Sequence, residues 1–529
     1  MIFCLARSRP LVTFYVLLSL SATFLPSAIA APEIRHFVPH AVVPGQRTVL
    51  TFSGSGLDKA SNLWTSFSGK AQRVANTNEG LVSFAVTCPA DTSGIQALQL
   101  CGPEGASNFQ LVMVDALQTS PHNDKHQQPD TALKIVPPVA VDCILKSEKI
   151  DYYRFTARSG ARFSIEVIAH RIGSQMDPVV RILNGIGDEI AFCDDDGGVW
   201  KDARFEFRPP ADGDYTIAVH DVGYGGGNAY DYRLRVTTEP LIWFTFPLAD
   251  PSEPGTPLEQ VGVKTDATQA GSPANPSPAL LLSSFPQLVE SEPNNSSTNA
   301  QAAAIPVILH GRIQNAEDVD YFRFEAAKDQ RLIFQSQTRS AGSPCDLVLT
   351  LRRLDGGQLA QSDLSAAGDA AVTNKFSEAG PFQLEIRELS GNATPNAPYR
   401  IKVQKFVPGF SLSTDKNIIN LKSGESTKLK ITAARHDFSG PIQLRFEPAL
   451  AGISLEEATV PEKKNEVELK IVAADTAKAG EFIHSQLIGT NSEGFTTPVS
   501  TRPAVRDAFP LMLNPPPVLE NLFVIAIRN

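Results

Sequence analysis

The sequence predicts an all-β protein made of tandem β-sandwich domains, and three observations support this fold class. Short runs alternate apolar and polar residues, as Phe163, Ile165 and Val167 do in RFSIEVIAH. The runs are separated by turn residues drawn from 39 prolines and 36 glycines. Beyond the first 30 residues, no long stretch repeats apolar residues every 3.6 positions, as an amphipathic helix would. One part of the chain is also repeated later in the sequence. Alternation with a period of two, interrupted by turns, is typical of sandwiches.

The first 30 residues have the pattern of a cleaved export signal. Arg7 and Arg9 give it a positive start, LVTFYVLLSL an apolar centre, and Ala28-Ile29-Ala30 a small-residue cleavage site. The apolar run is too short to cross a bilayer comfortably, and LFVIAI near the end has the length of a strand. We therefore expect an exported protein, either secreted, periplasmic or at the cell surface, with no membrane insertion after signal cleavage.

Residues 32–116 form the first expected domain, a small sandwich of immunoglobulin type. Its strands are expected in VPGQRTVLTFSGSGL, LVSFAVTCPA and NFQLVMVD.

Cys88 and Cys101 flank PADTSGIQALQL, where they either join neighbouring strands as a disulfide or remain buried thiols. Five cysteines follow the signal segment, so at least one is unpaired or pairs outside the chain. The chain has no C-x-x-C motif of zinc ribbons or redox proteins.

An internal repeat defines the next two domains. The 44 residues that begin at Asp151 align without a gap with those that begin at Asp320, and 13 positions are identical. The identities fall on strand aromatics, turn glycines and aspartates, for example Phe155 with Phe324. Farther on, YRLRV in the first copy matches YRIKV in the second. We infer that the chain contains two copies of one β domain.

The segments outside the repeat are assigned by composition. Residues 241–288 are rich in proline, serine and alanine, which predicts a linker, and LIWFTFPL at its start reads as a closing strand. After the second copy, STKLKITAA and EVELKIVAA predict another sandwich of immunoglobulin length. The expected order is a signal peptide (1–30), an immunoglobulin-like sandwich (32–116), the first copy (117–240), the linker (241–288), the second copy (289–405), an immunoglobulin-like sandwich (406–507) and a tail (508–529).

The repeat resembles the bacterial pre-peptidase C-terminal domain, a jelly-roll-like β-sandwich related to the collagen-binding domains of clostridial collagenases. The resemblance rests on DYYRF, MDPVVRILNGIGDEIAFCDDDGG, PPADGDYTIAVHD and YDYRLRV in the first copy; the second copy matches well as far as Asp363. Residues 32–116 resemble the TIG-type immunoglobulin-like domains that precede such modules in large exported proteins of planctomycete-like bacteria. In that family the modules are non-catalytic and accompany an enzyme, often a secreted peptidase. The resemblance implies a non-catalytic role here, without an attached enzyme domain.

The resemblance also implies a calcium site at the entrance to the second copy. The related collagen-binding domains bind calcium through a lead-in of the Glu-x-Glu-x-Asn-Asp type and acids near the first strand. The residues that match this pattern are Glu290, Glu292, Asn294, Asn295, Asp318 and Asp320. Carboxylate and amide oxygens are the ligands that calcium prefers. Asn295 stands where an aspartate is commoner, which lowers the charge, and a solvated acidic linker is the alternative.

The first copy departs from this pattern. Its lead-in, PHNDKHQQPD, keeps Asn123 and Asp124 but has no glutamate pair, and Lys149 stands at the position of Asp318. An ammonium group would repel calcium, so we expect no calcium there. His122 and His126 are four residues apart, but their polar segment contains no other expected metal ligand.

The stretch CDDDGG, residues 193–198, raises the question of a second cation site. The second copy has SDLSAAGDA there, so the fold does not require three acids. We expect Asp194 to end a strand in the first copy, as Asp363 does in the second. Asp195 to Gly198 predict a turn, with local cation binding as the alternative.

The sequence contains no G-x-S-x-G, H-E-x-x-H or phosphate-loop motif, so we expect no enzyme. The net charge of −10 argues against nucleic acid or anionic lipid as a partner. We expect a non-catalytic exported protein that binds an extracellular protein or polysaccharide. Tyr224 and Tyr230 are candidate contacts, unless Tyr230 is buried. The alternative function is an accessory or targeting partner of a secreted peptidase or other hydrolase.

Overall fold

The computed structural model describes residues 31–529 except 77, 79, 122–124, 197–198, 249–258, 263–283, 364–368, 392–395 and 513–515. The expected signal peptide therefore lies outside the described residues. Within them the chain forms forty strands, one short α-helix and five 3-10 helices, which confirms the all-β fold class. In this described part, no helix is long and apolar enough to cross a membrane.

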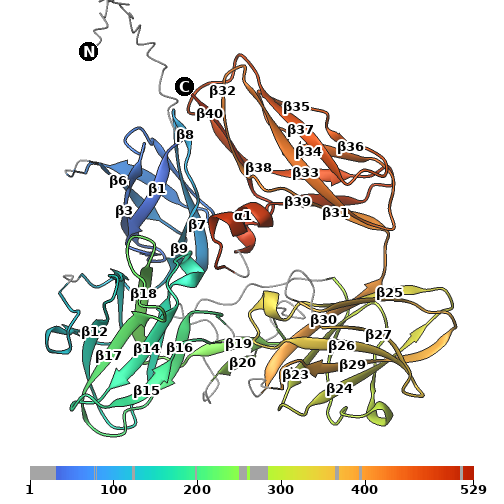
Figure 1. Ribbon diagram of the computed structural model, residues 1–529, viewed down its shortest axis with the longest axis horizontal. Coiled ribbons are helices and arrows are strands. Elements are labelled where there is room, and N and C mark those ends of the chain that lie inside the picture. Colours follow the sequence, from blue (N-terminus) through green and yellow to red (C-terminus); the bar gives the residue numbers. More distant parts are fainter. Residues whose placement is uncertain are drawn as a thin grey trace, which may run out of the picture. The chain divides into compact units, whose positions relative to one another are not determined.

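The first domain is a sandwich of two sheets, ordered β1-β3-β6-β5 and β2-β9-β7-β4 (Figure 1). The strands are β1 (Glu33–Val38), β2 (Ala41–Val42), β3 (Arg47–Ser55), β4 (Asn62–Thr65), β5 (Lys70–Val74), β6 (Leu81–Thr87), β7 (Gly94–Gly102), β8 (Gly105–Ala106) and β9 (Gln110–Val114). Phe52, Phe84 and Leu100 are buried between the sheets. Cys88 and Cys101 are both buried free thiols, so of the two alternatives the structure favours the thiols.

The two repeats have the same topology, as their sequences predict. In the first, the sheet β10-β12-β17-β14-β15 shares a core with β11-β18-β13-β16; in the second, β22-β24-β29-β26-β27 shares a core with β23-β30-β25-β28, and β21 is added beside β23. The first repeat consists of β10 (Leu133–Lys134), β11 (Val139–Ile144), β12 (Asp151–Ala157), β13 (Phe163–Ile168), β14 (Pro178–Leu183), β15 (Glu189–Cys193), β16 (Ala203–Phe207), β17 (Gly213–Asp221) and β18 (Asp231–Thr237). The second consists of β21 (Gln287–Val289), β22 (Gln301–Ala302), β23 (Val307–Ile313), β24 (Val319–Ala326), β25 (Arg331–Ser336), β26 (Leu347–Arg353), β27 (Gln358–Ser362), β28 (Ala371–Lys375), β29 (Gly380–Glu388) and β30 (Ala397–Lys405).

Identical residues in the two repeats make identical turns. Gly173 and Gly342 end the 3-10 helices η2 (His170–Ile172) and η4 (Arg339–Ala341), each with a φ of 87°. A residue with a side chain would be strained at such a positive φ, whereas glycine is not. The loop that follows η2 in the first repeat therefore has the same backbone conformation at its glycine as the loop that follows η4 in the second.

The expected linker begins with structured residues. LIWFTFPL forms β19 (Ile242–Phe246), which confirms the expected strand, and β19 pairs with β20 (Glu259–Gly262). Phe244 and Leu248 are buried in the core of the second repeat. Most of the remaining linker lies outside the described residues.

The last domain takes in the segment that was expected to be a tail. Its strands are β31 (Gly409–Ser413), β32 (Ile418–Lys422), β33 (Ser426–His436), β34 (Ile442–Glu447), β35 (Ile453–Glu456), β36 (Thr459–Val460), β37 (Glu466–Ala473), β38 (Phe482–Thr490), β39 (Thr496–Ser500) and β40 (Phe523–Arg528), with the helix α1 (Arg502–Ala508) before β40. β40 pairs with both β32 and β38. Phe523, Ile525 and Ile527 enter the core, so the tail prediction was wrong for these residues.

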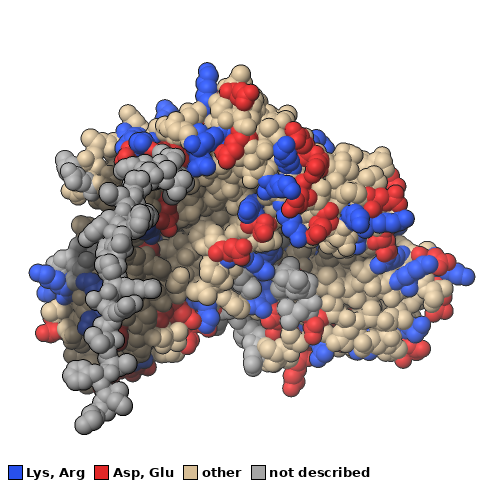
Figure 2. Space-filling view, turned by 45° about the horizontal axis from the view of Figure 1, so that its top comes forward, with Lys and Arg blue, Asp and Glu red and all other residues tan. Residues whose placement is uncertain are grey.

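Charged side chains of both signs cover the surface. Figure 2 shows acidic and basic groups interspersed on the visible face, without a broad field of one sign. Exposed pairs such as Lys428 with Glu468, 2.6 Å apart, and Lys430 with Glu466, 2.8 Å apart, join neighbouring strands β33 and β37. The face shown in Figure 2 has no extended basic area.

Candidate functional site

The lead-in to the second repeat folds back onto β23 of one sheet and β24 of the other. Val289 and its neighbours pair with β23 in parallel, which brings Glu290 alongside that strand. The backbone carbonyl of Asn294 accepts the N–H of Tyr321, 3.0 Å away, and so fixes the lead-in against β24. The acids of the lead-in and those of β24, which the sequence separates by about 25 residues, are therefore neighbours.

Five of the six residues expected to bind calcium meet here, and we call them the oxygen cluster: Glu290, Glu292, Asn294, Asp318 and Asp320. One carboxylate oxygen each from Glu292, Asp318 and Asp320 lies within 4.8 Å of the others. Glu290 is half-buried and Asn294 is fully buried beside them. The sixth residue, Asn295, is exposed, unlike its neighbour Asn294.

Several oxygens of the cluster are buried without a hydrogen-bond partner among the described residues. Both carboxylate oxygens of Asp320, the Oδ1 of Asp318 and the Oδ1 of Asn294 are in this state. Asp320 and Asn294 are 0% exposed, so water does not reach them freely. A buried polar atom without a partner is costly, and each such atom calls for an explanation. Hard oxygens that converge in this way are the ligand set of calcium.

The remaining contacts hold the cluster in position. The Oδ2 of Asp318 accepts the backbone N–H of Gln314 at 2.7 Å. Glu292 accepts the side-chain amide of Gln314 at 2.6 Å and the backbone N–H of Asn294 at 2.8 Å. Glu290 accepts the backbone N–H of Arg312 at 2.7 Å. Glu290, Glu292 and Asp318 are thus oriented by the protein, while the Oδ1 of Asp318 remains available to a ligand.

Two carboxyl groups of the oxygen cluster have pKa values well above their usual range. Burial, and then the charge of Glu290, raise the pKa of Asp320 to about 9. Burial raises the pKa of Glu290 to about 7, although the N–H of Arg312 works against this shift. A cation among these oxygens would remove the repulsion and favour the charged forms. The residues therefore fit calcium both in chemistry and in charge.

Two functional residues were missed by sequence reasoning. The hydroxyl of Tyr399 on β30 donates to Glu290 at 3.1 Å. Gly311 on β23 leaves the space for that contact, because a Cβ there would lie 2.2 Å from the Oε2 of Glu290 and from the Tyr399 hydroxyl. The repeat match YRLRV to YRIKV contained the signal for the tyrosine, but the glycine could be found only from strand register.

The CDDDGG stretch of the first repeat is a strand end followed by ion pairs. Asp194 follows β15 directly, as Asp363 follows β27, which confirms the shared strand end. Asp196 pairs with Arg204 at 2.8 Å and Asp195 with Lys201 at 3.4 Å. The backbone N–H of Val199 donates to the carbonyl of Asp196, while Gly197 and Gly198 of the expected turn lie outside the described residues. Two of the three acids are thus paired with cations of the protein.

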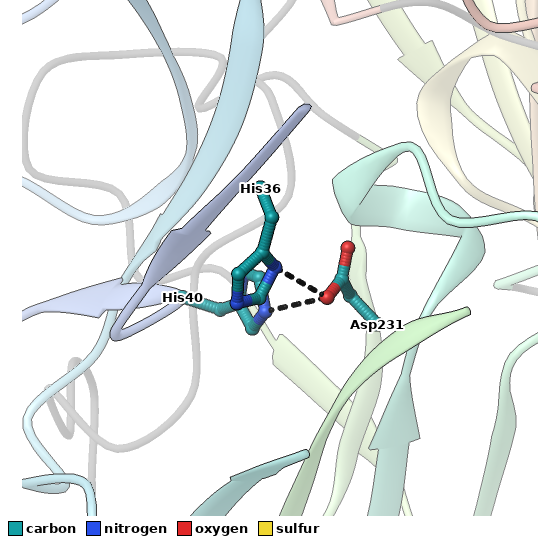
Figure 3. A group of neighbouring side chains, drawn as sticks. All are labelled: His36, His40 and Asp231. Carbon is teal, nitrogen blue, oxygen red and sulfur yellow. Dashed lines mark ion pairs between the residues drawn. The ribbon is translucent and has the colours of Figure 1, made fainter. Parts of the chain in front are cut away.

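A histidine pair connects the first domain with the first repeat. In Figure 3 the rings of His36 and His40 both face the carboxylate of Asp231, at the start of β18. The Nδ1 of His36 lies 2.8 Å, and the Nε2 of His40 3.4 Å, from the same carboxylate oxygen. Burial would lower the pKa of His40, but Asp231 and Asp142 together raise it. When the imidazole rings are protonated, these contacts are ion pairs between the first domain and the first repeat.

The two tyrosines proposed as partner contacts have different environments. Tyr224 is 43% exposed and stacks on His220, with the ring centres 4.7 Å apart. Tyr230 is partly buried and packs against the core of the first repeat. Tyr224 therefore remains a candidate contact, and Tyr230 has a structural role, as the alternative for it predicted.

Two of the three comparisons with known proteins found no match: no protein-family model and no curated protein matches the chain. Among solved structures, the pre-peptidase C-terminal domain of a collagenase from Bacillus anthracis is 17% identical, covers 23% of this chain and 100% of its own, and has a TM-score of 0.17. Fibronectin(III)-like modules of CbhA from Clostridium thermocellum are 10% identical, cover 43% of this chain and 90% of their own, and have a TM-score of 0.14. SGBP-B from the mixed-linkage glucan utilization locus of Bacteroides ovatus is 10% identical, covers 69% of this chain and 71% of its own, and has a TM-score of 0.14.

Proposed function

We propose that this protein is an exported, non-catalytic binding protein whose second repeat holds a structural calcium ion. The observation that carries the proposal is the oxygen cluster, in which carboxylate and amide oxygens converge and several of them, within the described part of the chain, are buried without a hydrogen-bond partner. Calcium would be bound by Asp318, Asp320 and Glu292, with Asn294 and Glu290 completing the set. Its charge would fix the lead-in to β24 and so stabilise the whole repeat.

The partner surface that we propose lies on the first repeat. β15 is the last strand of its sheet, and Phe192 on this strand is 52% exposed. Tyr224 and Trp200, in other loops of the same repeat, are 43% and 40% exposed. Exposed aromatic rings are the groups that most often anchor protein partners, and an edge strand can pair with an added chain. An extracellular protein or a polysaccharide is the partner class that we propose.

Thermal unfolding of the mature protein tests the calcium proposal. A ligand that binds only the folded state raises the melting temperature, so calcium should raise that of the second repeat relative to chelator. Glu292→Ala should reduce this shift. Glu317→Ala, which removes an exposed acid next to Asp318, should keep it. If the wild-type protein melts at the same temperature in calcium and in chelator, the proposed site is wrong.

Binding to immobilised collagen, peptidoglycan and soluble polysaccharides tests the partner surface. The Phe192→Ser and Tyr224→Ala variants should weaken binding to the partner that retains the wild-type protein. Val407→Ser, a change at a 64% exposed apolar residue in another part of the chain, is the matched control. Equal binding by all variants would contradict this surface, and a hydrolase that co-purifies with the protein would favour the accessory role.

A further inference from the structure

At the place where the second repeat has the oxygen cluster, the first repeat keeps one aspartate but has different side chains at two neighbouring positions. Asp151 corresponds to Asp320 in the repeat alignment. The carbonyl of His126 accepts the N–H of Tyr152 at 2.8 Å, as that of Asn294 accepts the N–H of Tyr321. His126 therefore occupies the place of Asn294.

The third position is fixed by strand register. Cys143 on β11 pairs with Tyr232 on β18, and Gly311 on β23 pairs with Tyr399 on β30. At Gly311 the missing side chain leaves space for the carboxylate of Glu290. Cys143 instead places its own thiol in the corresponding space. A thiol and an imidazole thus stand where the second repeat has the carboxylate of Glu290 and the amide of Asn294, and the aspartate is kept.

We propose that the first repeat binds a zinc-class transition-metal ion through Cys143, His126 and Asp151. We call these three residues the thiol–imidazole cluster. They are 5%, 2% and 1% exposed, and one ligand atom of each lies within 4.8 Å of the other two. Thiolate, imidazole and carboxylate are the three ligand types that zinc uses, whereas calcium takes oxygen alone.

The distances inside the thiol–imidazole cluster match ligands arranged around one ion. The Sγ of Cys143 is 3.7 Å from the Nε2 of His126, which is 3.6 Å from the Oδ1 of Asp151. Tetrahedral zinc bonds of ordinary length separate sulfur from nitrogen by about 3.6 Å and nitrogen from oxygen by about 3.4 Å. In the pair of His36 with Asp231, by contrast, nitrogen and oxygen are only 2.8 Å apart, which leaves no space for an ion between them.

Neighbouring groups support the three ligands. The hydroxyl of Tyr232 donates to the Oδ2 of Asp151 at 2.7 Å, and the side-chain amide of Gln127 donates to its Oδ1 at 2.9 Å. The hydroxyl of Tyr153 donates to the thiol of Cys143 at 3.2 Å. Such hydrogen bonds orient metal ligands from outside the coordination sphere. One thiolate and one carboxylate would neutralise a divalent ion, so the buried site would carry no net charge. With three protein ligands, the fourth zinc position would be left to water.

Cobalt(II) spectroscopy of the intact mature protein tests the proposal, because cobalt replaces zinc and reports on its ligands. After removal of metals, the wild-type protein should bind one cobalt ion with a thiolate-to-cobalt charge-transfer band and the visible bands of tetrahedral cobalt, and zinc should displace it. Cys143→Ser should abolish the charge-transfer band and weaken zinc binding by more than about tenfold, the lower limit found even for outer hydrogen-bond partners. His126→Gln should weaken zinc binding while the thiol is still present.

Two controls separate this site from other metal binding. Cys345→Ser changes the buried thiol of the second repeat and should keep the cobalt spectrum. Glu292→Ala should also keep it, so the zinc and calcium proposals can fail independently. Circular dichroism of each metal-free variant identifies any variant that does not fold. If Cys143→Ser does not fold, the loss of zinc affinity in His126→Gln tests the proposal instead. A wild-type protein that gives no charge-transfer band, or a band that persists in folded Cys143→Ser, would overturn the proposal.

Discussion

Replacing Asp320 by asparagine should make the second repeat more stable without calcium and should remove most of the stabilisation that calcium gives. The side chain is 0% exposed, and its pKa rises from 3.8 to about 9 because of burial and the nearby Glu290. Protonating such a group at pH 7 in order to fold costs about 4 kcal/mol, at about 1.36 kcal/mol per pH unit. Asparagine has nearly the same shape and carries no charge, so the variant avoids this cost.

Calcium should narrow this difference between the variant and the wild type. A saturating ligand at about 100 times its dissociation constant stabilises the folded wild type by about 2.7 kcal/mol. The Asp320→Asn variant has lost a charged ligand and should gain little. Because one kcal/mol corresponds to about 4–8 °C for a domain near 100 residues, calorimetry should resolve both effects in the transition of the second repeat.

The pH dependence provides a second check of the same group. The folded pKa of Asp320 lies above the unfolded value, so the stability that it contributes is complete below about pH 4 and is lost as the pH rises toward about 9. In chelator, the wild-type repeat should therefore melt lower at pH 8 than at pH 5. Asp320→Asn should flatten this slope, and the exposed control Glu317→Gln should not. A variant that melts lower than the wild type in chelator, or that retains the full calcium shift, would refute the reasoning.

Three further changes probe other parts of the molecule. Gly311→Ala places a methyl group 2.2 Å from the carboxylate of Glu290, so calorimetry should show a loss of about 1–3 kcal/mol and a smaller calcium shift. The raised pKa of His40 beside Asp231 gives stability that is complete below about pH 6.5 and is lost at higher pH; urea unfolding of His40→Gln should show a weaker pH dependence. Arg233 is 0% exposed and pairs with two buried aspartates, so Arg233→Ala should cost about 3–5 kcal/mol in urea unfolding.

The outcomes that would contradict these expectations are specific to each. A calcium shift in Gly311→Ala equal to that of the wild type would mean that Glu290 does not take part in the site. An unchanged pH profile in His40→Gln would show that the pair with Asp231 does not stabilise the folded chain. If Arg233→Ala loses less than about 1 kcal/mol of unfolding free energy, the guanidinium group is in contact with water and is not buried as the structure shows.

Much of the fold could be predicted from sequence because its signals are local. Period-two alternation located the strands, and gap-free identity between the repeats predicted their common topology before any strand pairing was known. LFVIAI forms β40, which confirms the expected strand, but its place in the last sandwich was missed because its partners β32 and β38 lie far back in the sequence. A six-residue apolar run indicates a strand, but it does not show which sheet the strand joins.

The oxygen cluster was expected because its lead-in resembles a known family motif, and five of the six expected residues are neighbours in the structure. His126 and Cys143 belong to no motif, and the structure places Cys143 and Asp151 near His126, which the sequence did not predict. Their proximity depends on the register of β11 with β18, which the sequence of either strand does not reveal.

Diffraction from crystals of the mature protein grown in calcium tests the central claim most directly. Anomalous scattering should place one calcium ion among Glu292, Asp318 and Asp320, with oxygen ligands at about 2.3–2.6 Å. If those carboxylates hold only water, or face away from one another at a saturating calcium concentration, the oxygen cluster is not a calcium site.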